Sequence, residues 1–103
     1  MQDKKQLLFQ VEEELKRNNN KISVGFINTL VGNSEVLYLH PTPCMRLCVI
    51  RLPSGHEVLG KAQVLDANND VPDIGQKVAK DNAVNEIWSL CGSIAKALME
   101  LKD

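Results

Sequence analysis

The stretch CMRLCVIRLPSGHEVLGKAQVL, residues 44–65, decides the fold of this 103-residue chain. Two apolar runs with strand composition flank the turn sequence Pro-Ser-Gly at residues 53–55. Proline presets the first turn position, and glycine takes the left-handed position of the bulge in a three-residue hairpin loop. The sequence therefore predicts a β-hairpin in which Arg51 faces Glu57 across the strands, close enough for an ion pair.

Both faces of this hairpin are apolar. One face takes the alternate residues Cys44, Cys48, Ile50, Val58, Gly60, Ala62 and Val64. The other takes Met45, Leu47, Val49, Leu59 and Leu65. A sheet with two apolar faces has to be covered twice, and a long C-terminal helix covers only one of them. The second face needs the N-terminal helices or another copy of the protein, and for this reason we expect a homo-oligomer.

Two helices are predicted before the hairpin. Apolar residues at helical spacing mark a first helix over residues 3–17, and the asparagines at 18–20 end it. Ser23 can cap a second, short helix. Because the denser pattern starts only after the asparagines, residues 1–20 are a candidate N-terminal helical appendage to a single domain that spans residues 1–103.

The remaining elements complete the predicted fold. Residues 34–40, SEVLYLH, have strand composition, and Pro41 and Pro43 mean that this strand either lies at a sheet edge or ends there. After the hairpin, a loop at residues 66–71 leads to Pro72, which suits the first turn of a helix. The pattern predicts an α+β fold: a small antiparallel sheet packed by a long C-terminal helical region and by N-terminal helices.

The C-terminal helix has one irregularity. Its second half keeps a clean apolar stripe, but the same stripe extended backward passes through Asp81. We expect the helix to cross closely over the strands at Gly75, opposite Gly60 and Ala62. This crossing places Asp81 and Asn82 at a subunit seam or a pocket rim. The alternative is an ordinary break between two helices.

The composition is that of an ordinary globular chain, with 44% hydrophobic and 24% charged residues. A formal net charge of -1 argues against a nucleic-acid-binding domain, which usually has a strongly basic face. No apolar stretch is long enough to span a bilayer, and the N-terminal residues lack the apolar core of a signal peptide. We therefore expect a soluble protein without a membrane partner. Three cysteines without a secretion signal favour free thiols.

Two motifs come close to sites of known chemistry, and both are disfavoured. GHEVLGKA, residues 55–62, nearly matches a phosphate-binding loop, but alanine replaces the magnesium-binding Ser or Thr and the residues lie in a hairpin. His40, Cys44 and Cys48 have the spacing H-x3-C-x3-C, yet no fourth metal ligand stands at a suggestive distance. No Ser/His/Asp or Cys/His arrangement stands out. We expect a non-enzymatic protein without a metal or cofactor.

The candidate ligand-binding residues form a polar set: Arg46, Arg51, His56, Lys61, Asn69, Asp81 and Asn82. Arg46 projects from an apolar strand face, where it either reaches the sheet rim by snorkelling or contacts an anion such as phosphate. Asp81 and Asn82 either cap a helix break locally or contact a ligand.

Residues 26–98 resemble a family of small tailed-phage and prophage proteins of unknown function. The matching features are the EVLYLH strand, the LCVIRLPSGHEVLGKA hairpin and the stretch DANNDVPDIGQKVAKDNAVNEIWSL. The last stretch is similar to the family's Ile-Gly-x-Lys-x-Ala helix start and its Ala-x-x-x-x-Trp-x-Leu ending. Gly75, Asn82 and an acid at the position of Asp81 belong to that pattern. The chain departs from it at His56, where the family has an aromatic residue.

The resemblance implies a phage accessory protein that acts on host machinery or host defence in the host cytoplasm. One candidate function is a sponge, an oligomer that binds a small nucleotide immune signal at a subunit interface. Its contacts to phosphates and base edges come from Arg46, Arg51, Lys61 and Asn82. The other is a protein-binding inhibitor of a host defence effector, such as a CRISPR or restriction nuclease, with the acidic residues 12–14 of the first helix in its contact surface.

Overall fold

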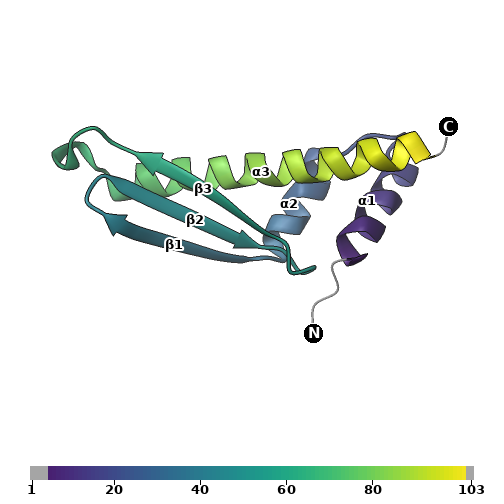
Figure 1. Cartoon of the computed structure of the whole chain (residues 1–103), viewed down its shortest axis with the longest axis horizontal. Helices are drawn as coiled ribbons and strands as arrows, with labels where there is room; N and C mark the ends of the chain where they lie inside the picture. The colour runs from purple at the N-terminus through teal and green to yellow at the C-terminus, as the bar shows by residue number, and fades with distance from the viewer. Residues whose placement is uncertain (1–4, 102–103) are drawn as a thin grey trace.

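The computed structural model describes residues 5–101, which form three α-helices and one three-stranded antiparallel sheet (Figure 1). The elements are α1 (Lys5–Arg17), α2 (Val24–Gly32), β1 (Glu35–Thr42), β2 (Met45–Arg51), β3 (Glu57–Gln63), a short 3-10 turn (Ala67–Asn69) and α3 (Pro72–Leu101). The predicted α+β fold is confirmed. Residues 3 and 4, which the predicted first helix includes, lie outside the described part of the chain.

The hairpin has the predicted register. Arg51 lies opposite Glu57 in the strand register, and the Leu52 amide donates to the His56 carbonyl oxygen at 2.8 Å. Gly55 has a φ of 91°, the left-handed conformation that this turn position requires. The strand order is β1-β2-β3, so β1 is an edge strand, as the prolines after residue 40 allowed. It continues to Thr42, and its pairing with β2 becomes irregular after Leu39.

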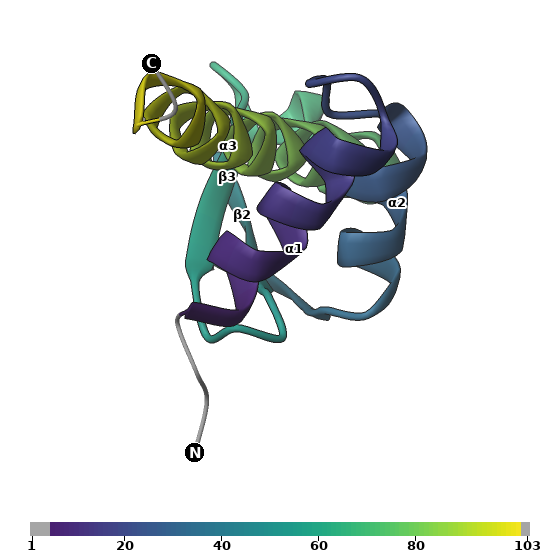
Figure 2. The same cartoon turned by 90° about the vertical axis from the view of Figure 1, so that its right-hand side faces the viewer.

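Helix α3 is continuous over 30 residues, so the described chain has no break between two helices near Asp81. Its first half lies along one face of the sheet, and its second half lies beside α1 and α2 (Figures 1 and 2). The buried stripe repeats every four residues: Ala79, Ala83, Ile87, Cys91 and Ala95. Four residues exceed one helical turn, so the stripe winds gradually around α3 from the sheet toward the N-terminal helices.

Two sequence-based expectations about α3 are therefore wrong. Asp81 does not interrupt the buried stripe, which passes through Ala79 and Ala83, and it is exposed. The closest crossing over Gly60 is not at Gly75. A Cβ on Gly60 would overlap the backbone of Ala79 and Ala83, whereas a Cβ on Gly75 would come within 2.5 Å of Arg46 Cδ. The prediction assumed that α3 buries one straight stripe against one surface, whereas α3 packs first on the sheet and then on α1 and α2.

Helix α1 contributes to the same core as the sheet and α3. Leu7, Val11 and Leu15 are buried, so the segment expected as a candidate appendage packs against the rest of the chain. The asparagines end this helix as predicted, and Asn19 and Asn20 both have positive φ angles. Over residues 5–101, no helix combines the length and the hydropathy that crossing a bilayer requires.

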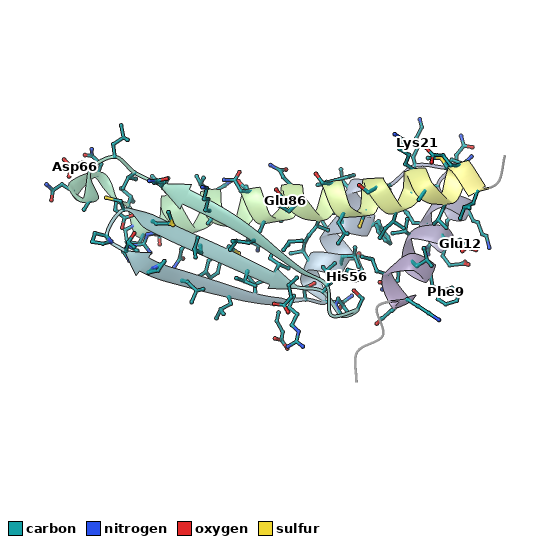
Figure 3. The ribbon with its side chains drawn as sticks, in the orientation of Figure 1. Phe9, Glu12, Lys21, His56, Asp66 and Glu86 are labelled. Atoms are coloured by element: carbon teal, nitrogen blue, oxygen red, sulfur yellow. The ribbon has the colours of Figure 1, made fainter. Side chains whose placement is uncertain are left out.

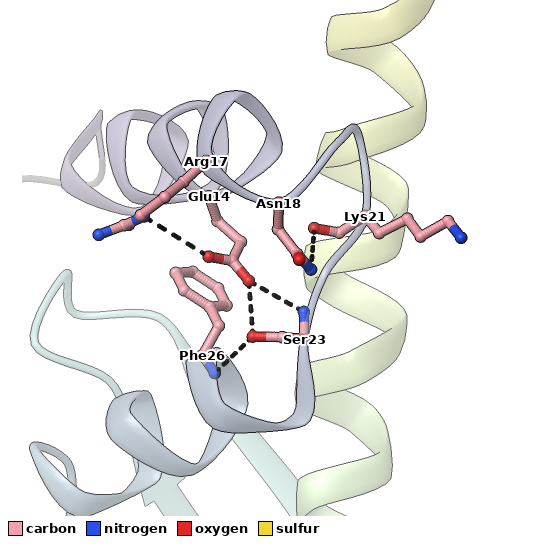
Figure 4. A network of polar contacts seen from close by, with 6 residues as sticks. All are labelled: Glu14, Arg17, Asn18, Lys21, Ser23 and Phe26. Carbon is pink, nitrogen blue, oxygen red and sulfur yellow. Dashed lines mark hydrogen bonds and ion pairs between the residues drawn. The ribbon is translucent and has the colours of Figure 1, made fainter.

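A buried carboxylate fixes the connection between α1 and α2 (Figure 4). Glu14 is 5% exposed, and its Oε2 accepts hydrogen bonds from the Ser23 amide at 2.9 Å and the Ser23 hydroxyl at 2.7 Å. The same hydroxyl oxygen accepts from the Phe26 amide at 3.0 Å, so Ser23 is the predicted N-cap of α2. Glu14 therefore holds the cap and does not belong to an exposed acidic surface of α1.

The face of the sheet opposite α3 is uncovered by the described residues. It carries the apolar side chains of Leu37, Leu39, Met45, Leu47, Val49 and Leu59, which the strand register places on one side. We call this set the open face. Three of its leucines are 42–56% exposed. Helices α1 and α2 pack on α3 and do not supply the second cover that the hairpin pattern calls for.

Candidate functional site

The structure separates the seven predicted ligand-binding residues into different regions. Arg46 and Asn69 line a cavity beneath the start of α3. Lys61 and Asn82 line a hollow beside β3. Arg51 and His56 lie at the end of the sheet that holds the hairpin loop, where His56 is labelled in Figure 3. The structure therefore brings six of the seven together in pairs, not as one site, and Asp81 pairs with Lys77, which is outside the set.

The cavity beneath the start of α3 has a volume of about 170 Å³, and Arg46 is one of the residues that line it. Arg46 Nη2 lies 2.6 Å from Asp70 Oδ2, and Arg46 Nε lies 2.9 Å from Asp70 Oδ1. These hydrogen bonds hold the pKa of Asp70 below its ordinary value and raise the pKa of Arg46. Because Asp70 already occupies the guanidinium, another anion has to displace this carboxylate to bind Arg46.

Sequence reasoning missed Asp70, although its signal was present. The loop before α3 reads DANNDV, and its two aspartates flank the predicted residue Asn69. Asp66 caps the 3-10 turn by accepting from the Asn68 amide at 3.0 Å. Asp70 is the one that reaches the sheet, and His40 Nε2 lies 3.9 Å from its Oδ2. An arginine on an apolar strand face was itself reason to search the adjoining loop for a carboxylate.

The hollow beside β3 has a volume of about 540 Å³ and is open to solvent. Its lining combines a cation, two amides, a carboxylate and an apolar side chain, from Leu59, Gly60, Lys61, Asn82, Asn85 and Glu86. Asn82 Nδ2 donates to the Lys61 carbonyl oxygen at 2.7 Å, which joins α3 to the outer edge of β3. Asn85 and Glu86 were not predicted, but they follow Asn82 at the spacing that shares one helix face.

The other predicted residues have local contacts. His56 Nδ1 lies 2.7 Å from the buried Ser54 Oγ within the hairpin loop. Lys77 Nζ lies 2.6 Å from Asp81 Oδ2, an exposed i,i+4 ion pair on α3. Among residues 5–101, no group of three His, Cys, Asp or Glu side chains is placed to hold a metal ion.

A groove between α1 and α2 was not anticipated. It has a volume of about 320 Å³, and both phenylalanines of the chain, Phe9 and Phe26, line it. Phe9 is 64% exposed on α1 (Figure 3). Glu13 and Arg17 add opposite charges to the rim. Exposed aromatic residues beside a groove are typical of interaction surfaces. The sequence signal for this groove was that Phe9 lies outside the apolar stripe of the first helix, where a phenylalanine is exposed.

The fold is that of a small α+β protein in which one long helix backs a three-stranded antiparallel sheet. Residues 15–99 match the Phage protein (N4 Gp49/phage Sf6 gene 66) family. The chain belongs to this family, and the resemblance to small phage proteins is confirmed. No curated protein and no solved structure matches the chain.

Proposed function

We propose that this phage protein is a non-enzymatic accessory protein that counters host defence in the host cytoplasm. Most specifically, the protein would be a homo-oligomeric sponge that binds a small nucleotide immune signal and needs no cofactor. Membership of a phage protein family supports the setting. The hollow beside β3 carries the nucleotide part of the proposal, because it gathers Lys61 and Asn82 from distant parts of the chain.

The hollow has groups suited to each part of a nucleotide. The Lys61 ammonium is a mobile point charge for a phosphate. Asparagine amides pair with base edges, and a carboxylate accepts from an exocyclic amino group, so Asn85 and Glu86 suit the base. Leu59 is 52% exposed at the same hollow and offers an apolar surface to the base plane.

The Arg46 cavity is the weaker candidate for this ligand. Its volume of about 170 Å³ is smaller than the roughly 300 Å³ at which ligand pockets usually begin. Its guanidinium is also already paired with Asp70. We therefore assign the nucleotide to the Lys61 hollow and leave Arg46 a structural role in the loop before α3.

Native mass spectrometry tests the proposal on protein purified directly from cells, before and after a panel of cyclic nucleotides is added. The expected result is an oligomer that gains one nucleotide mass at a fixed stoichiometry. Asn85→Leu should weaken that binding at least tenfold, whereas the matched exposed control Asn68→Leu, outside the hollow, should not. Wild-type protein that gains no nucleotide mass, or an Asn85→Leu variant that binds like wild type, contradicts the assignment.

A second candidate function is inhibition of a host defence effector, such as a CRISPR or restriction nuclease, by direct protein contact. The α1–α2 groove favours it, because Phe9 offers an exposed aromatic anchor there. Inhibition of purified nucleases of both kinds tests this function. Phe9→Asp should abolish inhibition, while Leu8→Asp, also on α1 but outside the groove, should retain it. No inhibition by the wild-type protein excludes this candidate for the nucleases tried.

A further inference from the structure

The open face is unlike the solvent side of an ordinary sheet. Antiparallel strands with one face in water normally alternate apolar and polar residues. Here β2 is half-buried or buried on both sides at every residue before Arg51, and the row Leu37-Val49-Leu59 crosses all three strands without a polar residue. An exposed apolar surface of this continuity marks a contact site.

We propose that a second copy of this chain packs against the open face, sheet to sheet, around a two-fold axis. A continuous apolar surface can pack against its own copy, as the isologous contact of a two-fold interface requires. Two facing sheets pack about 10 Å apart with interdigitated side chains. The contact completes for β2 the double cover that α3 supplies on one side only. This inference concerns assembly and stands without a nucleotide ligand.

The size of the open face suits a small interface. With strands about 4.8 Å apart and about 3.3 Å of rise per residue, three strands of seven residues cover roughly 300 Å² of flat area. Side-chain relief raises the buried surface above that value on each partner. Over two partners the flat area alone comes to roughly 600 Å², and specific interfaces begin at roughly 1,200 Å² in total, so the contact belongs with the small, weak interfaces. We expect a dimer whose population depends on protein concentration.

Charged residues on the same side of the sheet distinguish a two-fold axis that runs parallel to the strands from one that runs across them. The row Glu35-Arg51-Glu57 crosses the strands at one end of the open face. An axis parallel to the strands stacks this row on its copy, with Glu35 over Glu57 of the partner subunit and arginine over arginine. Like charges placed opposite each other are destabilising. This arrangement is disfavoured.

An axis across the strands removes that clash and creates a favourable contact. It lays the row Leu37-Val49-Leu59 of one copy over the row Leu39-Leu47-Lys61 of the other, and the charged row then falls outside them. Lys61 ends the second of these rows, beside Leu47. In this arrangement Lys61 reaches Glu57 of the partner subunit, and symmetry repeats the pair. Both residues are exposed in the single chain.

The arrangement also bears on the hollow beside β3. Lys61 borders both the open face and the hollow, so the dimer places each hollow at the rim of the interface. A site at a subunit interface is what the sponge proposal describes, and a phosphate bound there has to displace Glu57 of the partner subunit from the Lys61 ammonium. The two ideas remain separable, because assembly is measured on nucleotide-free protein and ligand binding by the added mass.

Sedimentation velocity on the full, nucleotide-free chain over a wide concentration range tests the dimer. Leu37→Glu should raise the dimer dissociation constant at least tenfold. The matched control Ile74→Glu, at an apolar residue 62% exposed on α3 and away from the open face, should not. Far-UV circular dichroism establishes that both variants are folded. A wild-type monomer throughout, or equal loss in both variants, overturns the proposal.

A charge exchange tests the direction of the axis. Lys61→Glu and Glu57→Lys should each weaken the dimer, because each creates a like-charge contact across the interface. The double variant restores opposite charges and should recover most of the wild-type affinity. A double variant as weak as the two single variants combined overturns the proposed arrangement.

Discussion

Arg46 on β2 and Asp70 in the loop before α3 form a bidentate ion pair, with distances of 2.6 Å from Nη2 to Oδ2 and 2.9 Å from Nε to Oδ1. Gly75 makes room for the arginine, since a Cβ there would come within 2.5 Å of Arg46 Cδ. The ion pair therefore fixes the loop that enters the longest helix of the described chain to one end of the central strand β2.

Asp70→Asn should lower the urea midpoint of unfolding at pH 7, because the neutral amide loses the charge-assisted pair with Arg46. The hydrogen bonds from Arg46 lower the pKa of Asp70 in the folded protein below the ordinary 3.8. A lowered folded pKa gives stability that is present above the ordinary value and lost as pH falls through the folded pKa. The gap between wild type and variant should therefore close as unfolding is measured from pH 7 toward pH 2.

The control for this pair is Asp81→Asn. Asp81 pairs with Lys77 on the exposed surface of α3, and its side chain is 59% exposed. Exposed ion pairs of this kind contribute at most about 1 kcal/mol, so this variant should stay close to wild type. Equal midpoint losses in the two variants at pH 7 would contradict the structural role of Asp70.

Gly60→Ala should destabilise the fold by about 2 kcal/mol or more, because the added Cβ meets backbone atoms of Ala79 and Ala83. Backbone atoms in a packed helix cannot rotate away as a side chain does. Gly92→Ala is the matched control, since a Cβ there has nothing within 4 Å. That change should stabilise by about 0.5–1 kcal/mol, as alanine usually does in a helix interior. Urea unfolding that ranks the two variants in the opposite order contradicts the close crossing at Gly60.

Features that depend on a few neighbouring residues were predicted from the sequence, whereas features that depend on packing between elements were not. The hairpin and the Ser23 cap were predicted because turn and cap chemistry lie within a few residues. The expected interruption of the α3 stripe at Asp81 was wrong because a single stripe cannot describe a helix that packs first on a sheet and then on two helices.

The candidate sites were less predictable than the fold. Arg46 and its partner Asp70 are 24 residues apart, and the sequence alone supplies no spacing rule for such a pair. The Lys61 hollow depends on a contact with Asn82 from another element, 21 residues away. Composition selected Lys61 and Asn82 individually, but only the packing of α3 on β3 brought them together.

Glu14→Ala should cost about 1–3 kcal/mol in unfolding free energy. It leaves the half-buried Ser23 amide and hydroxyl without their carboxylate partner, which is more costly than losing an exposed contact. Glu13→Ala is the matched control, because the Glu13 side chain is 64% exposed and pairs with Lys16 at 3.7 Å. That variant should lie within about 0.5 kcal/mol of wild type. A similar cost for both residues in urea unfolding would show that Glu14 does not anchor the α2 cap.

Cys91 should make the protein less stable in alkali. Burial raises the pKa of its thiol from the ordinary 9.0 to about 11. A raised folded pKa gives stability that is fully present below pH 9 and lost as pH rises toward 11. The loss attributable to this thiol should reach about 2–3 kcal/mol by pH 11.

Cys91→Ala isolates the contribution of this thiol to the pH dependence. The variant is expected to be less stable than wild type at pH 8, because it leaves a small cavity in the core. Its unfolding free energy should then fall less steeply between pH 9 and 11, so the two curves converge. Parallel curves would mean that the Cys91 thiolate is as well solvated in the folded chain as in the unfolded one, contrary to its complete burial in the core.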